Sequence, residues 1–194
     1  MATEVCQLIA EGRSRLRPVT DQPGHEAEIL LAAALGKSRA WIMAHPEERI
    51  LDCEATDRYE AYVTRRSHGE PVAYVLGEKE FWSLPLEVTP DVLIPRPETE
   101  LVVALTHLLR GQQARVLDLA AGSGAIALAL ARELPRITVI GTDISAAAIA
   151  VAQRNARRLG LANVQFRTGN WFDPVAEERF DLIASNPPYI AASD

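Results

Sequence analysis

The sequence has few cysteines and no long apolar run. Cys6 and Cys53 are the two cysteines among 194 residues, and their spacing fits neither a metal site nor a CxxC motif. We therefore expect reduced thiols in a cytoplasmic protein, with no bound metal. No apolar run reaches about 18 residues, the length that indicates a membrane span. The N-terminal stretch carries Glu4 and Glu11 among its apolar residues, which does not fit a secretory signal.

Positive charge is also in short supply. Lysine and arginine number 20 against 26 aspartates and glutamates, which gives a net charge of −6. A cut at residue 70 leaves an excess of three acidic residues on each side. A protein that holds a nucleic-acid backbone usually carries a basic stripe. The counts therefore speak against a direct nucleic-acid partner.

What is present is the composition of a soluble globular protein, with 48% hydrophobic and 24% charged residues. Residues 1–70 have apolar side chains at helical spacing and predict a small helical bundle. Within it, the segment 53–69 predicts a polar, exposed helix. Residues 71–95 alternate apolar and polar side chains and contain four prolines, which predicts a β-hairpin linker.

From residue 114 the pattern alternates between strand and helix. The expected strands are 114–120, 136–144, 163–169 and 180–185, and the expected helices between them are 123–134 and 145–160. Alternation of this kind is typical of a parallel sheet with helices on its faces. The fold class is therefore α/β.

Two glycines mark the turn between the first of these strands and its helix. Gly122 begins the pattern G-x-G-x-x-A, which is the dinucleotide-binding fingerprint. Asp143 ends the second strand, 21 residues further on, about where an acid binds a ribose diol. This half of the sheet predicts a nucleoside-bearing cofactor without separating NAD from S-adenosylmethionine. The same residues also fit a simple tight turn and an acid at a helix N-terminus.

Asp118 lies near the tip of the first strand, where a buried carboxylate costs free energy unless it has a partner. It either caps the strand end or lies beside the methionine end of a methyl donor.

The fourth strand runs into Asn186-Pro187-Pro188-Tyr189. Proline restricts φ and lacks an amide hydrogen, so these residues form a stiff turn. In open α/β sheets ligands bind beyond the carboxyl ends of the strands, where this turn lies. The Asn186 oxygen and nearby carbonyls can hold both hydrogens of a planar amino group while the ring of Tyr189 stacks on it. The turn therefore favours methyl transfer to an amide or aryl nitrogen, catalysed by positioning and electrostatics.

With these residues in place, the chain resembles the release factor glutamine methyltransferases, the PrmC/HemK family. The similarity covers nearly the whole chain, through "PVAYVLGEKEFW", "VLIPRPETE", "DLAAGSGAIALALA", "GTDIS" and "SNPPYI" in this order. It implies a helical substrate-docking domain over 1–70, a β-hairpin linker over 71–95 and a Rossmann-like class I methyltransferase domain over 96–194.

The resemblance also implies an activity. A methyl group passes from S-adenosyl-L-methionine, leaving S-adenosyl-L-homocysteine, to the side-chain amide nitrogen of the glutamine in the Gly-Gly-Gln loop of class 1 peptide-chain release factors. The implied cofactor-binding residues are Asp118, Gly122, Gly124, Asp143, Asn170 and Trp171. The implied substrate-binding residues are Asn186, Pro187, Pro188, Tyr189 and Arg96, of which Asn186, Pro187 and Tyr189 are catalytic. Trp171 equally fits simple packing, and Arg96 fits a solvated arginine at a helix start.

Three features depart from the family pattern. Ala120 stands where a glycine is common, and Asn170 stands where an acid is often found. The family also continues with further strands beyond the position of Tyr189, so we expect this domain to hold the first four strands of a longer sheet.

Three other readings remain open at this point. An amino-group methyltransferase acting on adenine or cytosine in nucleic acid uses the same turn chemistry. An NAD-dependent oxidoreductase fits the glycine pattern alone. A fragment that binds the cofactor or a release factor without turnover fits an incomplete sheet.

Overall fold

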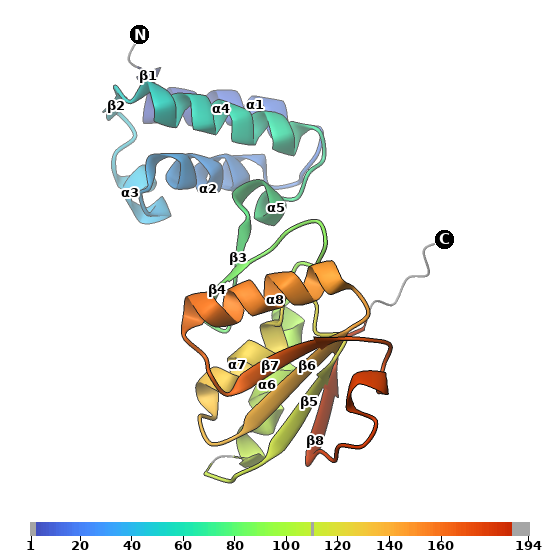
Figure 1. Cartoon of the computed structure of the whole chain (residues 1–194). Helices are drawn as coiled ribbons and strands as arrows, with labels where there is room; N and C mark the ends of the chain where they lie inside the picture. Colours follow the sequence, from blue (N-terminus) through green and yellow to red (C-terminus); the bar gives the residue numbers. More distant parts are fainter. Residues whose placement is uncertain (1–2, 110, 188–194) are drawn as a thin grey trace. The chain divides into compact units, whose positions relative to one another are not determined.

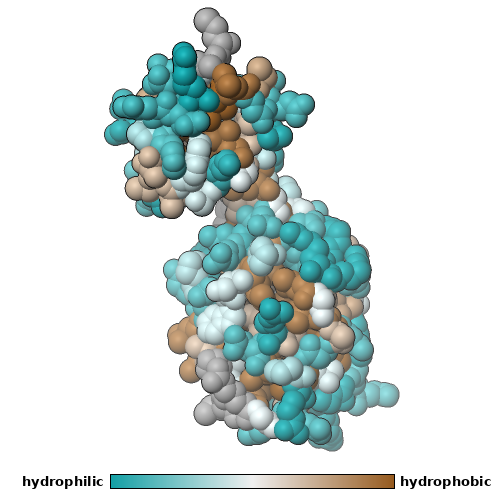
Figure 2. Space-filling view, turned by 90° about the vertical axis from the view of Figure 1, so that its left-hand side faces the viewer, coloured by the Kyte–Doolittle hydropathy of each residue, from teal (hydrophilic) through white to brown (hydrophobic). Residues whose placement is uncertain are grey.

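The computed structural model describes residues 3–109 and 111–187, apart from the side chains of His107 and Leu108 (Figure 1). The chain divides into two compact units, Met1–Leu76 and Gly77–Asp194. In the view of Figure 2 the surface is mostly hydrophilic, with patches of apolar residues. Within the described ranges no helix is both long and apolar enough to cross a membrane.

The first unit is helical. Its elements are α1 (Val5–Leu16), α2 (Pro23–Leu35), α3 (Arg39–Ala44), α4 (Cys53–Ser67) and α5 (Val72–Leu76), with a short antiparallel pair formed by β1 (Thr3–Glu4) and β2 (Arg49–Ile50). Helix α2 has Pro23 in its first turn and ends at Gly36, whose left-handed φ of 62° suits a glycine. The predicted helical bundle is confirmed.

Helix α4 is not the exposed helix that its polar sequence predicts. Ala55, Tyr59 and Val63, which follow one another at a spacing of four residues, are buried. The Tyr59 hydroxyl donates to the Leu8 carbonyl of α1 at 2.9 Å. A Cβ atom at Gly12 would lie 2.1 Å from that hydroxyl oxygen, so α1 has a glycine where the tyrosine packs. The helix and its polar outer side are as predicted, but the prediction was wrong for this one narrow apolar face, which is buried.

The second unit begins with the hairpin of β3 (Glu78–Phe81) and β4 (Leu84–Glu87), which pair antiparallel. The two residues between them, Trp82 and Ser83, have φ values of 51° and 57°, as a tight two-residue hairpin turn requires. The hairpin predicted within 71–95 is confirmed, although the start of that segment forms α5 instead. The domain division at residues 70/71 and 95/96 stays a prediction.

A four-stranded parallel sheet forms the centre of this unit (Figure 1). The strand order is β7-β6-β5-β8, with β5 at Arg115–Leu119, β6 at Thr138–Asp143, β7 at Val164–Thr168 and β8 at Leu182–Ser185. The connecting elements are η1 (Pro97–Thr99), α6 (Glu100–Leu105), η2 (Thr106–Leu109), α7 (Ala125–Glu133), α8 (Ala146–Leu159) and η3 (Asp173–Val175). The predicted strand–helix alternation is confirmed.

Alternate side chains of the central strands belong to two separate cores. Val116 and Val139 pack in the cluster that includes the apolar face of α7. Leu117 and Ile140 pack with Val175 of η3 in a second cluster. A strand points successive side chains to opposite faces, so both faces of the sheet are covered at the central strands β5 and β6. This burial holds the carboxyl ends of β5, β6 and β8 side by side.

Candidate functional site

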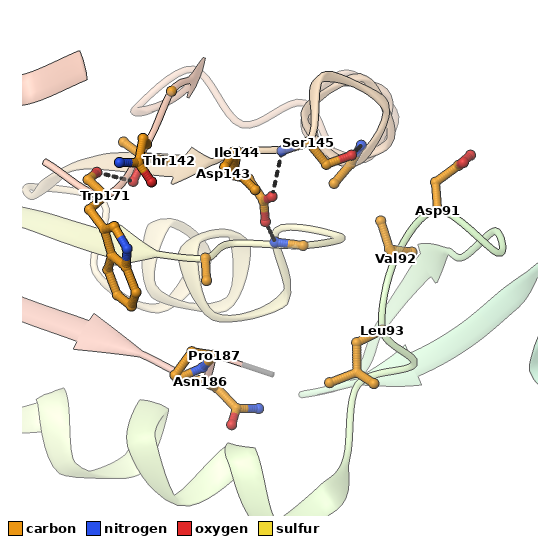
Figure 3. A pocket seen from close by; sticks show the side chains of 15 residues that line it. Asp91, Val92, Leu93, Thr142, Asp143, Ile144, Ser145, Trp171, Asn186 and Pro187 are labelled. Carbon is orange, nitrogen blue, oxygen red and sulfur yellow. Dashed lines mark hydrogen bonds between the residues drawn. The ribbon is translucent and has the colours of Figure 1, made fainter. Parts of the chain in front are cut away.

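A cavity of about 460 Å³ lies at the carboxyl ends of the strands (Figure 3). It is lined by Asp91, Val92, Leu93, Ala120, Gly122, Thr142, Asp143, Ile144, Ser145, Ala148, Gly169, Asn170, Trp171, Asn186 and Pro187. These residues come from the loops after β4, β5, β6, β7 and β8, from the last two residues of β6 and from the start of α8. Five separate chain segments therefore build one site where an open α/β sheet binds ligands.

Asp143 lies at the centre of this site, between two loops. Its Oδ2 atom accepts from the backbone N–H of Gly122, and its Oδ1 atom accepts from the backbone N–H of Ser145, both at 2.9 Å (Figure 3). The carboxylate thus joins the glycine turn after β5 to the N-terminus of α8. Each carboxylate oxygen can accept more than one hydrogen bond. Asp143 can therefore hold the loops together and still bind hydroxyl groups of a ligand.

The glycine turn itself has a strained residue. Ala120, which stands where the family commonly has glycine, has a φ of 58°, a left-handed conformation that costs an L-residue roughly 1–2 kcal/mol. Gly124 has a φ of 81°, and a Cβ atom there would lie 2.8 Å from the Phe166 ring. Gly124 does not line the cavity; packing against Phe166 accounts for the glycine at the start of α7.

We expect Ala120→Gly to stabilise the protein. Glycine removes the left-handed strain but adds freedom to the unfolded chain, so the free energy of unfolding should rise by about 0.5–1 kcal/mol. Urea unfolding of the two proteins measures this difference. Ala121→Gly is the matched control, because Ala121 is buried and its φ is not positive, and it should lower the stability. A fall for Ala120→Gly would contradict the assignment of strain.

Asp118 is buried beneath the same turn, at 1% exposure. Its Oδ2 atom accepts from the Ala127 N–H at 3.0 Å, whereas its Oδ1 atom has no hydrogen-bond partner in the described part of the chain. Burial, together with the nearby charge of Asp143, raises the pKa of Asp118 to about 7, against the lowering effect of the Ala127 bond. Asp118 lines a smaller cavity of about 50 Å³, which Thr99 and Asn186 also line.

The raised pKa of Asp118 predicts a pH-dependent difference between the protein and its Asp118→Asn variant. The folded state binds the proton more tightly than the unfolded chain, so the wild type loses stability as the pH rises from about 3.8 to about 7. The neutral variant lacks this loss. The free energy of unfolding of the variant, minus that of the wild type, should rise by roughly 2–3 kcal/mol between pH 5 and pH 8. Urea unfolding at both pH values measures this; a constant difference would contradict the raised pKa.

The end of β8 and the turn that follows it are each held by a side-chain hydrogen bond, one to β5 and one to η1. The Ser185 hydroxyl donates to the Leu119 carbonyl at 2.8 Å. The Asn186 Nδ2 atom donates to the Thr99 hydroxyl at 3.0 Å. Asn186 and Pro187 lie across the cavity from Asp143, and Leu93 lines the same cavity (Figure 3). Pro188 and Tyr189 lie outside the described residues, so their predicted roles stay predictions.

Comparisons with known proteins identify the family to which the chain belongs. A family profile described as "PrmC N-terminal domain" matches residues 7–77, and one described as "Methyltransferase domain" matches residues 111–193. The chain is 47% identical, over 99% of its length, to a release factor glutamine methyltransferase from Pseudomonas aeruginosa, of which it covers 68%. The chain belongs to the release factor glutamine methyltransferase family.

Two further matches complete the comparison. The release factor glutamine methyltransferase of Aliivibrio fischeri is 46% identical over 90% of this chain, and the match covers 62% of that protein. The chain thus spans about two thirds of the length of these relatives, 62% of one and 68% of the other. A SAM-dependent methyltransferase from Thiobacillus denitrificans, crystallised with S-adenosyl-L-homocysteine, is 34% identical over 46% of this chain and 36% of its own, with a TM-score of 0.40. The methyltransferase profile over residues 111–193, together with the parallel sheet, confirms the class I methyltransferase fold expected from the sequence.

Most of the residues that the resemblance to this family implies lie together. Gly122, Asp143, Asn170 and Trp171, with Asn186 and Pro187, line the larger cavity, and Asp118 lines the smaller one. Trp171 is 58% exposed and lines the cavity, so it lies at the rim and is not packed in a core. Arg96 is exposed and lines neither cavity.

The structure adds a wall that the sequence did not indicate. Asp91, Val92 and Leu93 follow the hairpin and close one side of the cavity (Figure 3). Their signal in the sequence is slight: apolar residues between Pro90 and Pro95 in a segment without regular structure. Only the tertiary fold brings this segment to the carboxyl ends of strands that come later in the chain.

Asn155 of α8 holds the hairpin against the glycine turn. This fully buried side chain accepts from the Glu87 N–H at 2.7 Å, and its Nδ2 atom donates to the carbonyls of Glu87 and Ser123, each at 3.0 Å. Next to it, Arg154 donates to the Glu87 carboxylate at 2.7 Å. The end of β4, from which the cavity wall extends, is thereby fixed to the loop that carries Gly122.

Proposed function

We propose that this chain transfers a methyl group from S-adenosyl-L-methionine to the side-chain amide nitrogen of the glutamine in the Gly-Gly-Gln motif of class 1 release factors, and so modulates translation termination. Membership of the family supports the reaction class. The observation that carries the proposal is that Asn186 and Pro187 line the same cavity as the Asp143–Gly122 hydrogen bond. Donor-binding and acceptor-binding residues thus meet in one site.

The cavity has the chemistry that an adenosyl group requires. Asp143 offers acceptors for ribose hydroxyls, and Val92, Leu93 and Trp171 offer apolar surface for a flat ring. Asp118 provides a buried carboxyl near the same turn, on the side of the smaller cavity. When bound, S-adenosylmethionine supplies a methyl group made electrophilic by the sulfonium.

The residues after β8 would prepare the acceptor nitrogen. An amide nitrogen is a poor nucleophile because its lone pair is delocalised into the carbonyl group. The Asn186 side-chain oxygen and the Pro187 carbonyl would each accept one of its hydrogens, which orients the nitrogen and favours a more pyramidal geometry. Tyr189 would hold the plane of the amide. Catalysis on this scheme is positioning and electrostatic stabilisation without a strong base. The nitrogen–methyl bond would form as the sulfur–methyl bond breaks, and the nitrogen would then release one proton to solvent.

Mass spectrometry of a release factor after incubation with the protein and S-adenosylmethionine tests the proposal. We expect a gain of one methyl group on the peptide that contains Gly-Gly-Gln, and no gain with Asn186→Ala. Duplex DNA in a parallel reaction tests the rival substrate. Methylated DNA with an unmodified release factor would overturn the proposal, and so would binding of NAD in place of S-adenosylmethionine in isothermal titration.

Cofactor binding without transfer to either substrate would instead indicate a non-catalytic binding protein. We further propose that the helical region 1–70 docks the release factor. We also propose that the reaction takes place in the cytoplasm. Deletion of this region should raise the KM for the release factor, and leave the affinity for the cofactor unchanged.

A further inference from the structure

Thr99 makes a contact with the site that the proposed function does not use. Its hydroxyl oxygen accepts from the Nδ2 atom of Asn186 at 3.0 Å, across 87 positions of the sequence. Both residues are half-buried. A hydrogen bond to a partly buried amide meets less competition from water than one at the surface. The contact is therefore able to fix the amide.

Thr99 is itself held in place by its neighbours in the chain. It ends η1, and its N–H donates to the Arg96 carbonyl at 3.0 Å. The carboxylate of Glu100, the next residue, accepts from the Trp82 N–H at 2.9 Å, which attaches this turn to the hairpin. These two hydrogen bonds fix the turn that carries the Thr99 hydroxyl. The "PETE" segment of the sequence therefore does more than begin a helix: it carries the hydroxyl that contacts Asn186.

Thr99 and Asn186 also border the cavity of about 50 Å³ beside the buried Asp118. The amide of Asn186 thus shares this cavity with two polar groups of different kinds, a hydroxyl and a carboxyl. The χ2 angle of asparagine is broad and roughly two-fold, so the side chain needs a partner to hold it in one orientation. A hydroxyl can accept from Nδ2 or donate to Oδ1, and here it accepts. With Nδ2 directed at Thr99, Oδ1 is the atom directed the other way.

We propose that Thr99 is a positioning residue, which orients the Asn186 amide so that its oxygen, and not its NH2 group, faces the substrate amide. This inference rests on the proposed function. A reversed amide would set NH2 against the NH2 of the substrate, and neither group accepts a hydrogen bond from the other. Thr99 does not touch the reacting atoms; it acts through Asn186.

Two substitutions test this role. Thr99→Val keeps the shape and removes the hydroxyl, and should lower kcat for release factor methylation about tenfold, which corresponds to the loss of one hydrogen bond. Thr99→Ser keeps the hydroxyl and should retain kcat within about twofold. The cofactor Kd by isothermal titration should be the same in all three proteins. Thr138→Val, at an exposed position at the start of β6, is the control and should change neither quantity.

The contact has a second readout that does not depend on turnover. The side-chain NH2 signals of Asn186 in a ¹H–¹⁵N spectrum are identified by their absence in Asn186→Asp. They should shift in Thr99→Val and stay in place in Thr99→Ser. If the wild type is inactive but the variants show this pattern of shifts, the proposed function is refuted and the hydrogen bond between Thr99 and Asn186 is confirmed. Unchanged signals in Thr99→Val, unchanged kcat in Thr99→Val, or an equal loss in both variants would overturn the positioning role.

Discussion

Replacing Asn186 by alanine is expected to reduce the rate of methyl transfer by about 10²–10³-fold, the range observed when one preorganised hydrogen-bonding group is removed from an active site. The variant loses the oxygen that would hold one hydrogen of the substrate amide. It keeps Asp143 and its bonds to Gly122 and Ser145. The Kd of S-adenosylmethionine should therefore stay within about threefold. Single-turnover transfer to a release factor measures the first quantity and isothermal titration the second.

Asn186→Asp provides the control for shape. It keeps an oxygen acceptor in the position of the amide, but it brings a negative charge and no donor for Thr99. Its transfer rate should lie between those of the wild type and the alanine variant. A collapse of cofactor affinity in Asn186→Ala would show that Asn186 is a cofactor-binding or folding residue, and the assignment to the substrate would then be wrong.

Asp143→Ala is expected to have the opposite profile, with cofactor affinity reduced by about 10²–10³-fold. Two losses combine here. The carboxylate no longer accepts from ribose hydroxyls, and the N–H groups of Gly122 and Ser145 lose their common partner, so the two loops that form the cavity are no longer joined. Hydrogen bonds to a charged group contribute about 1.5–3 kcal/mol each. At saturating cofactor, kcat should recover much of the wild-type value.

Asp91→Ala separates this effect from the general loss of negative charge. Asp91 is an exposed carboxylate that lines the same cavity, and its hydrogen bonds are to neighbouring Thr89. Titration with S-adenosylmethionine should show a change of no more than about threefold for this variant. If Asp91→Ala weakens binding as strongly as Asp143→Ala, the cavity attracts the cofactor by overall charge and the specific role of Asp143 is refuted.

The parts of the fold that the sequence predicted correctly are those set by local pattern. The runs that became the central strands β5 and β6 are mostly apolar and buried, because strands covered on both faces need no alternation, whereas β7 at the edge alternates apolar and polar residues. Gly122 and Asp143 were found at their loops because both positions follow directly from strand ends. Two local interpretations of Asp143 were left open, and the structure makes them compatible: the same carboxylate joins the start of α8 and lines the cavity.

What the sequence did not predict depends on contacts between distant segments. The buried face of α4 exists because Gly12 makes room for Tyr59, and neither residue indicates the other. The wall at 91–93 and the partnership of Thr99 with Asn186 likewise need the folded chain. Propensity and periodicity describe single elements; they do not report which loop will face which.

The three hydrogen bonds of Asn155 have a consequence for local stability. Because this one side chain binds both backbone groups of Glu87 and the carbonyl of Ser123, displacement of Asn155 breaks its bonds to the hairpin and to the glycine turn in the same event. Amide protons on both sides then exchange with solvent through a shared opening. The glycine turn is in this way part of one cooperative unit with a hairpin distant from it in the chain, and we expect the two segments to open to solvent at the same rate.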